Sequence, residues 1–202
     1  MKKILNLNND EYLLLFSFIS VFFFVICAAP MEIKSNDNHR IIVNFVAPIN
    51  SVEWMVVNDN VMGGVSHSRV SINPEGYMEF NGDVSLDYGG GFASVRSSYE
   101  NWGIGKFDGF VIKVWGDGKS YQFRCRMGNN FDGVAYRHYF QTKNENWQEI
   151  RLPFSKFVPT YRGRIISDVA PLDPQKIRNL GLMISDKQSG NFNLKIAWIG
   201  VY

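Results

Sequence analysis

Apolar and polar residues alternate with a period of two in most segments after residue 40, and no long stretch has the apolar period of a helix. Successive side chains of a strand point to opposite faces, so this alternation predicts strands with one buried and one exposed face. In segment 121–127 the alternation separates an apolar set, Tyr121, Phe123, Cys125 and Met127, from a polar set, Gln122, Arg124 and Arg126. Further strands are predicted within 41–46, 77–82, 110–115, 136–140, 150–152, 180–184 and 192–196.

Turn-forming residues separate these segments, and the 18 glycines and 15% aromatic content suit short strands joined by tight turns. The one predicted helical turn has Asp173 as its N-cap and Pro174 at its first position. We therefore predict an all-β fold, a single antiparallel β-sandwich or jelly roll over residues 45–202. Trp147 and Phe192 are expected to pack in its core.

The first thirty residues, 1–30, are predicted to be a signal peptide or a membrane anchor, and 31–44 are predicted to be a linker. The nearly uninterrupted apolar run 13–29 is long enough to serve as a membrane tether. A mitochondrial presequence would be rich in Arg and poor in acids, whereas this segment lacks Arg and contains Asp10 and Glu11. The segment therefore favours export or membrane anchoring over a mitochondrial location.

Charge and cysteine usage exclude several classes of protein. The formal net charge of +2, from 21 basic and 19 acidic residues, gives no basic footprint for nucleic acid. Cys125 is the one cysteine outside the N-terminal segment and is predicted to be a buried thiol without a disulfide. The three histidines, His39, His67 and His138, have no second His or Cys at metal-ligand spacing. Neither a metal site nor a cofactor is therefore expected.

No catalytic motif is found, and the chain is predicted not to be an enzyme. The glycine clusters 61–66 and 89–92 do not match a phosphate-binding loop and are predicted to be tight turns or bulges. Most aspartates adjoin Gly or Asn, which is typical of turns, and no G-x-S-x-G elbow is present. Glycoside hydrolysis by paired carboxylates and serine hydrolysis stay open only as minor alternatives.

A group of polar and aromatic residues in one predicted strand is the best candidate for a binding site. Phe92, Ser94 and Arg96 share one face of that strand, while Ala93 and Val95 occupy the other. A guanidinium beside an aromatic ring suits a concave, half-hydrated face that meets hydroxyls, carboxylates or a partner's backbone. The alternative is that Arg96 forms a structural ion pair with a nearby Asp.

Several motifs together resemble one known family, and they cover about residues 45–202. They are the segments 54–66 (WMVVNDNVMGGVS), 90–96 (GGFASVR), 107–109, 116–121, 147–157, 162–164 and 180–192. The chain resembles the complex I intermediate-associated protein family in this order of motifs. The resemblance implies a galactose-binding-like β-sandwich and a role as an assembly factor for NADH:ubiquinone oxidoreductase, with no catalytic residue to carry over.

The function that we predict is therefore a non-enzymatic binding domain that acts as an assembly or scaffold factor. Its partner would be a protein, such as a respiratory complex subunit, and the candidate binding residues are Arg96, Phe92, Ser94, Asn58 and Asp59. The alternative is an exported carbohydrate-binding module whose partner is a glycan. An exposed aromatic platform with Arg96 would favour the glycan, and a large apolar patch rimmed by polar groups would favour a protein.

Overall fold

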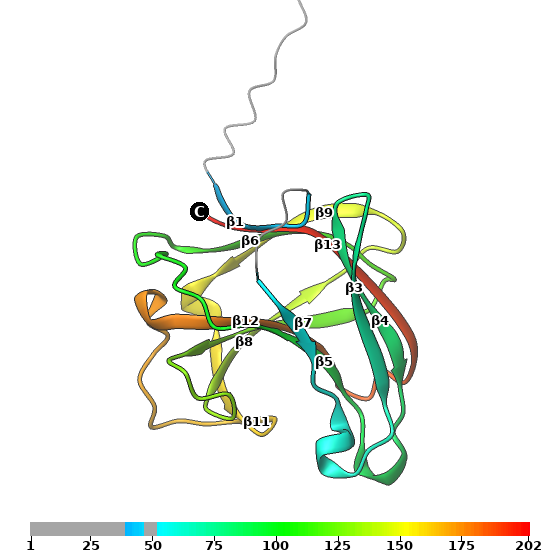
Figure 1. Cartoon of the computed structure of the whole chain (residues 1–202). Coiled ribbons are helices and arrows are strands. Elements are labelled where there is room, and N and C mark those ends of the chain that lie inside the picture. Colours follow the sequence, from blue (N-terminus) through cyan, green and yellow to red (C-terminus); the bar gives the residue numbers. More distant parts are fainter. Residues whose placement is uncertain (1–38, 47–51) are drawn as a thin grey trace, which may run out of the picture. The chain divides into compact units, whose positions relative to one another are not determined.

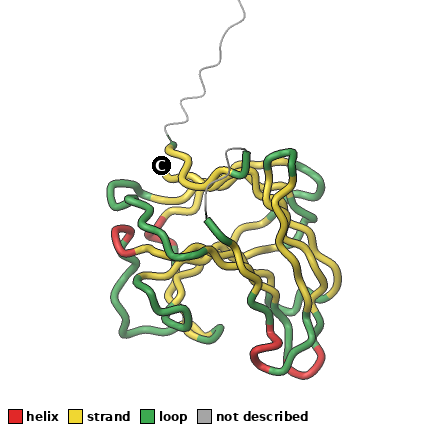
Figure 2. The backbone as a smooth tube through the Cα atoms, viewed as in Figure 1, coloured by secondary structure: helices red, strands yellow, loops and turns green. Residues whose placement is uncertain are grey.

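The computed structural model describes residues 39–46 and 52–202, and all of its long elements are strands (Figure 1). The strands are β1 Arg40–Asn44, β2 Trp54–Val56, β3 His67–Asn73, β4 Tyr77–Val84, β5 Ala93–Ser97, β6 Gly109–Trp115, β7 Ser120–Met127, β8 Ala135–Gln141, β9 Trp147–Pro153, β10 Val158–Tyr161, β11 Arg164–Ile165, β12 Ile177–Ile184 and β13 Gly190–Val201. Four short 3-10 turns, η1 Asp59–Met62, η2 Asp87–Gly89, η3 Phe154–Lys156 and η4 Pro174–Lys176, join them. The predicted all-β class is confirmed, and Figure 2 shows helix only in short turns.

The strands form two antiparallel sheets that lie face to face (Figure 1). The six-stranded sheet has the order β3-β4-β13-β6-β9, with β1 paired to β13, and the seven-stranded sheet has the order β11-β10-β8-β7-β12-β5-β2. The fold is therefore a two-sheet antiparallel β-sandwich, as predicted. In the seven-stranded sheet β12 lies between β5 and β7, which places residues near 96 and 124 on either side of residue 181.

The core fills the space between the two sheets with side chains from alternate positions of the strands. Phe110 of β6 packs against Phe123 of β7, with ring centroids 4.7 Å apart, and this contact joins the sheets. Tyr121, Phe123 and Cys125 are 0% exposed, so the predicted apolar face of β7 is the core face. Phe192 is buried as expected, at 3% exposed. Gln122, Arg124 and Arg126 consequently point away from the other sheet.

The expectation that Trp147 packs in the core is wrong, because its side chain is 38% exposed. Trp147 lies five positions before the buried Leu152 on β9, and an odd spacing in a strand places two residues on opposite faces. Its ring instead packs against Tyr77 on the outer surface of the six-stranded sheet, at a centroid distance of 6.1 Å.

The N-terminal boundary of the sandwich differs from the prediction, because β1 lies within the segment expected to be a linker, 31–44. Arg40–Asn44 pairs with the end of β13, so the sandwich includes residues before the predicted boundary at 45. The predicted signal or anchor segment, 1–30, lies outside the described residues. Within the described ranges, no helix is long and apolar enough to span a membrane.

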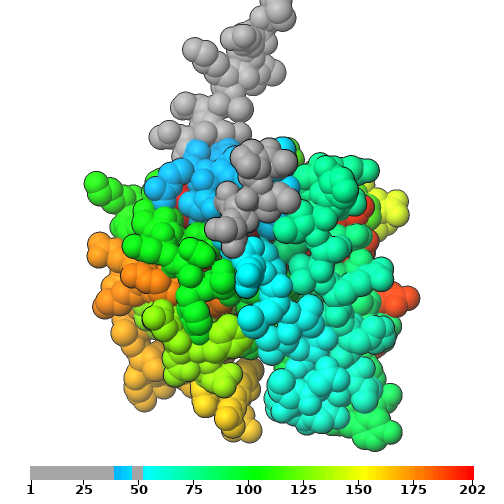
Figure 3. All heavy atoms as spheres, viewed as in Figure 1, coloured from blue at the N-terminus to red at the C-terminus, as the bar shows by residue number. Residues whose placement is uncertain are grey.

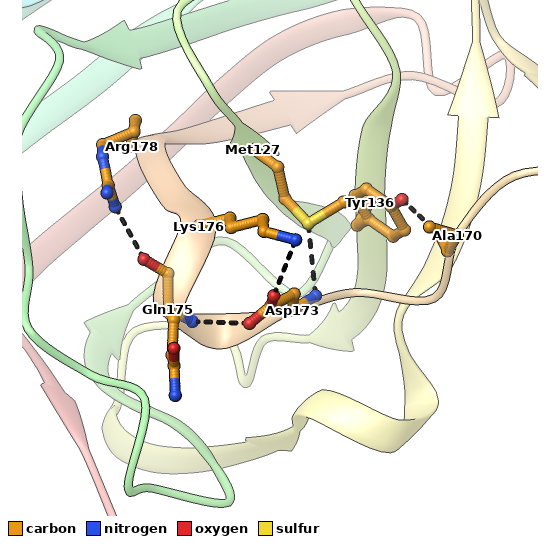
Figure 4. Close-up of polar contacts among 7 residues, drawn as sticks. All are labelled: Met127, Tyr136, Ala170, Asp173, Gln175, Lys176 and Arg178. Atoms are coloured by element: carbon orange, nitrogen blue, oxygen red, sulfur yellow. Dashed lines mark hydrogen bonds and ion pairs between the residues drawn. The ribbon is translucent and has the colours of Figure 1, made fainter.

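The predicted helical turn is present as η4, and Figure 4 shows how it is capped. The Asp173 carboxylate accepts a hydrogen bond from the Gln175 backbone N–H at 3.0 Å, and Pro174 occupies the first helical position. Asp173 also lies 3.2 Å from the Lys176 ammonium. This turn leads directly into β12, the strand on which the candidate site is centred.

Candidate functional site: an arginine-lined cavity beside a buried aspartate

The loops around η1 and η2 are held together by one buried carboxylate, that of Asp59, which is 1% exposed. Its oxygens accept hydrogen bonds from the Ser66 hydroxyl and from three backbone N–H groups, those of Ser66 (3.0 Å), Gly91 (2.7 Å) and Phe92 (3.2 Å). Burial by itself would raise the pKa of the Asp59 carboxyl, but these hydrogen bonds together lower it below its usual value. We call Asp59 and these donors the Asp59 clamp.

Glycines of the clusters 61–66 and 89–92 lie so close to the Asp59 carboxylate that no side chain would fit at their positions, in agreement with their predicted role in tight turns. A Cβ at Gly64 would lie 2.4 Å from the Asp59 Cγ, and one at Gly90 would lie 2.6 Å from its Oδ2. Both distances are far below van der Waals contact, so any larger residue would displace the carboxylate. The conformation of Gly63, with φ +90°, ends η1 in the left-handed region that favours glycine.

Two of the predicted site residues, Asn58 and Ser94, also help to hold these loops and are buried. The Asn58 side-chain oxygen accepts hydrogen bonds from the Ser68 hydroxyl (2.8 Å) and the Ser94 N–H (3.3 Å), and the Ser94 hydroxyl donates to the Val57 carbonyl. Asn58 is 9% and Ser94 is 2% exposed, so little of either side chain is accessible to a partner. Their positions fit a supporting role under the site.

Phe92 and Arg96 line a cavity of about 570 Å³ on the outer face of the seven-stranded sheet. The loops around η1 and η2 form one wall, through Val61, Met62 and Gly89–Phe92, and Arg162 and Gly163 of the β10–β11 turn form the other. Figure 3 shows the surface hollowed at its lower edge between these cyan and gold segments. The floor consists of side chains from β5, β7, β8 and β12.

Four arginines converge on this floor, and we call Arg96, Arg124, Arg126 and Arg137 the arginine cluster. With Arg162, the cavity lining contains five arginines but two aspartates, Asp132 and Asp186, in a chain whose formal net charge is only +2. Positive charge is therefore concentrated in one place on an almost neutral protein. Of the cluster the sequence singled out Arg96 alone.

The hydrogen bonds of the arginine cluster go to neutral acceptors. Arg96 Nη1 donates to the Phe131 carbonyl at 3.1 Å, and the guanidinium lies over the Phe131 ring at 4.9 Å. Arg124 Nη1 lies 3.4 Å from Gln122 Oε1, and Arg126 Nη1 lies 3.3 Å from Asn179 Oδ1. Across residues 39–46 and 52–202 no cluster arginine forms an ion pair, so the alternative in which Arg96 forms a structural ion pair is not found there.

Arg124 and Arg126 are buried cations that form no ion pair within residues 39–46 and 52–202. They are 8% and 5% exposed, and the Nε atom of each is buried without a hydrogen-bond partner among the described residues. Burial, together with repulsion from the neighbouring arginines, lowers the pKa of Arg124 to about 10 and that of Arg126 to about 9. Such an arrangement can receive a ligand that brings negative charge.

The fold places this protein in the class of β-sandwich domains, and solved structures share the fold. The family 11 carbohydrate-binding module of the cellulase Lic26A-Cel5E of Clostridium thermocellum is 15% identical, with a TM-score of 0.58 over 81% of this chain and 93% of that module. The same module in complex with a β-1,3-1,4-mixed-linked tetrasaccharide is 16% identical, with a TM-score of 0.56. At this identity the likeness shows the fold alone.

Residues 43–196 match the family model "Complex I intermediate-associated protein 30 (CIA30)". The chain belongs to this family, so the resemblance seen in the sequence is confirmed. The mitochondrial complex I intermediate-associated protein 30 of Mus musculus is 26% identical over 199 residues, which cover 86% of this chain and 59% of that protein. A probable member from Caenorhabditis elegans is 33% identical over 100 residues, or 48% of this chain and 29% of that protein.

The predicted export or membrane anchoring is wrong, because the relatives from mouse, C. elegans, Drosophila melanogaster and Neurospora crassa are all named mitochondrial proteins. These names point to the mitochondrion. The prediction relied on the apolar run 13–29 and on the absence of Arg before it. An apolar run reports the affinity of a segment for an apolar environment, and this affinity does not specify which membrane or compartment receives the chain.

Proposed function

We propose that this domain is a non-catalytic binding protein that helps to assemble respiratory complex I by holding a protein partner in the arginine-lined cavity. Membership of the complex I intermediate-associated family supports the role in assembly. The single observation that carries the binding mode is the set of buried arginines, Arg124 and Arg126, that face a cavity without a carboxylate partner among the described residues. The match spans 59% of the mouse relative's length, so the transfer of that protein's role in assembly to this chain is itself proposed.

The charge of the cavity favours an anionic protein segment over a neutral glycan. Neutral sugars offer hydroxyl groups, which do not neutralise the positive charge that the five arginines concentrate in the cavity. The wall of the cavity also carries two apolar side chains, Val61 and Met62, that are 72% and 67% exposed. Exposed apolar groups next to a polar pocket are typical of protein-binding surfaces.

The test is capture of complex I subunits from host cells that lack the endogenous protein and express a tagged copy. The unaltered protein should retrieve identified complex I subunits and restore the mature complex on native gels. Arg96→Gln should reduce both, and Arg69→Gln should reduce neither, because Arg69 is exposed on β3 of the other sheet, where its side chain donates a hydrogen bond to Asn81. Normal assembly with Arg96→Gln, or retention of the protein on mixed-linked β-glucan in place of subunits, would refute the proposal.

A further inference from the structure

Three members of the arginine cluster lie in one row across the seven-stranded sheet. Gly181 of β12 is paired with Arg96 of β5 on one side and with Arg124 of β7 on the other, and Arg124 is paired with Arg137 of β8. Neighbouring strands are about 4.8 Å apart, so the backbones that carry Arg96 and Arg124 are about 10 Å apart. The row therefore reads arginine, glycine, arginine, arginine.

Gly181 is buried and contributes no side chain between the two cations of this row. A Cβ at this position would lie 2.9 Å from the Val95 carbonyl oxygen and 3.6 Å from the Arg96 Cγ. A larger residue would therefore crowd the neighbouring strand β5. The cavity that Arg96, Arg124 and Arg137 line is suited to an anionic group that contacts more than one guanidinium group.

We infer that this cavity takes carboxylates from an acidic segment of a partner protein, and that apolar side chains of the same segment pack on Val61 and Met62; this inference rests on the proposed function. Guanidinium groups bind carboxylates through two parallel N–H···O bonds, and the arginine row offers such forks side by side. Arg124 and Arg126 lack a carboxylate among the described residues, and the partner supplies it.

The size and the wall of the cavity favour a protein segment over a small inorganic anion. A single phosphate would occupy only a small part of about 570 Å³, a volume within the range of sites that hold drug-sized ligands. A phosphate would also leave the apolar side chains of Val61 and Met62 in water. A segment that carries both acidic and apolar residues covers both parts of the site.

The direct test is binding of the purified chain to a short fluorescent peptide in which paired Glu residues are flanked by Leu, followed by anisotropy. The control peptide has Gln in place of each Glu. We expect the Glu peptide to bind, the Gln peptide to bind at least about tenfold more weakly, and the affinity for the Glu peptide to fall as salt is raised. Equal binding of the two peptides, or no binding of the Glu peptide, would overturn the inference.

Substitutions locate the binding in the cavity. Arg96→Gln and Arg124→Gln should each weaken binding of the Glu peptide by about ten- to a hundredfold, and the matched Arg69→Gln should change it less than about twofold. Met62→Ser should weaken it several-fold while leaving the salt dependence unchanged. Melting curves accompany each variant, and Arg96→Gln, whose side chain is the less buried, keeps the test valid if Arg124→Gln does not fold.

Inorganic phosphate, added as a competitor, separates the two sources of negative charge. We expect phosphate to displace the Glu peptide only at concentrations where it acts as general salt. Displacement by phosphate at concentrations comparable to those of the peptide would show a small-anion site and overturn the inference.

If the peptide binds in the cavity but complex I subunits are not captured from cells, the proposed function fails while the ligand chemistry stands. If complex I subunits are captured from cells but the Glu peptide does not bind, the ligand chemistry is refuted and the proposed function stands.

Discussion

In the Asp59 clamp one buried carboxylate accepts four hydrogen bonds, whereas the buried cations of the arginine cluster line a cavity and form no ion pair among the described residues. The two regions adjoin, because Phe92 donates its backbone N–H to Asp59 while its side chain lines the cavity. A buried polar group that is fully bonded stabilises the fold, and one that is left without its counter-charge costs stability until a ligand provides that charge. This difference supports a structural role for Asp59 and the proposed binding role of the arginine cluster.

The largest expected effect tests the strand alternation on which this comparison depends. Cys125 is 0% exposed, and burial raises the pKa of its thiol, so it should react with a thiol reagent only when the protein unfolds. Labelling of the native protein should then be slower than that of the denatured protein by a factor of about 1,000 or more, as expected for global unfolding. Fast native labelling would place Cys125 on the outer face and Arg124 and Arg126 in the core.

The next effect is on the Asp59 clamp. Asp59→Asn should lower the free energy of unfolding by about 3 kcal/mol or more, because an amide N–H₂ would face donors that now bond to a carboxylate. The lowered pKa means that the carboxylate stabilises the folded state above its ordinary pKa of about 3.9 and that this contribution is lost as pH falls through the folded-state pKa. Urea unfolding of the wild type and of Asp59→Asn, at pH 7 and at acidic pH, measures the loss of stability and its pH dependence. A free energy of unfolding equal to that of the wild type at pH 7 would contradict the structural role of Asp59.

A smaller effect of opposite sign is expected in the arginine cluster. Arg124→Met removes a buried cation that lies among other arginines and replaces it with an apolar side chain of similar length. The free protein should become more stable by about 1 kcal/mol, while binding of the acidic peptide is lost. Arg69→Met, on the other sheet, serves as the control and should change neither quantity much. A clear loss of stability with Arg124→Met would show that Arg124 serves the fold.

The contrast between these regions also shows what could be predicted from the sequence. The alternation of polarity in 121–127 places Cys125 inward and Arg124 outward, because it depends only on neighbours along the chain. The same rule, applied to Leu152, would have placed Trp147 on the outer face. Local chemistry likewise predicted the N-cap at Asp173 and the turns at the glycine clusters.

The arginine cluster could not be assembled from the sequence, because its members meet through pairing between distant segments. The insertion of β12 between β5 and β7 brings Arg96 and Arg124 to either side of Gly181, and no local pattern specifies this order of strands. The polar face of β7 was visible, with Gln122, Arg124 and Arg126 in alternation. Three outward polar residues on a strand are common on a solvated sheet face, and only their burial in the folded protein sets them apart.

The smallest expected effect is the response of the free energy of unfolding to alkaline pH. This response distinguishes the Arg126 guanidinium, which forms no ion pair among the described residues, from the hydrogen-bonded Asp59 carboxylate. Burial and the neighbouring arginines lower the pKa of Arg126 to about 9, below its ordinary value of 12.5 in the unfolded chain. Between these two values the unfolded chain binds more protons at this position than the folded protein, so the contribution of Arg126 to the free energy of unfolding rises with pH. The difference in unfolding free energy between wild type and Arg126→Met should therefore shift in favour of wild type from pH 8 to pH 10, because the other titrating groups are shared.

Saturating acidic peptide should abolish this shift, since a bound carboxylate stabilises the charged guanidinium and raises its pKa. A difference that does not change with pH in the free protein would mean that the folded protein keeps the Arg126 guanidinium charged at pH 10, and the expected cost of its burial would then be absent.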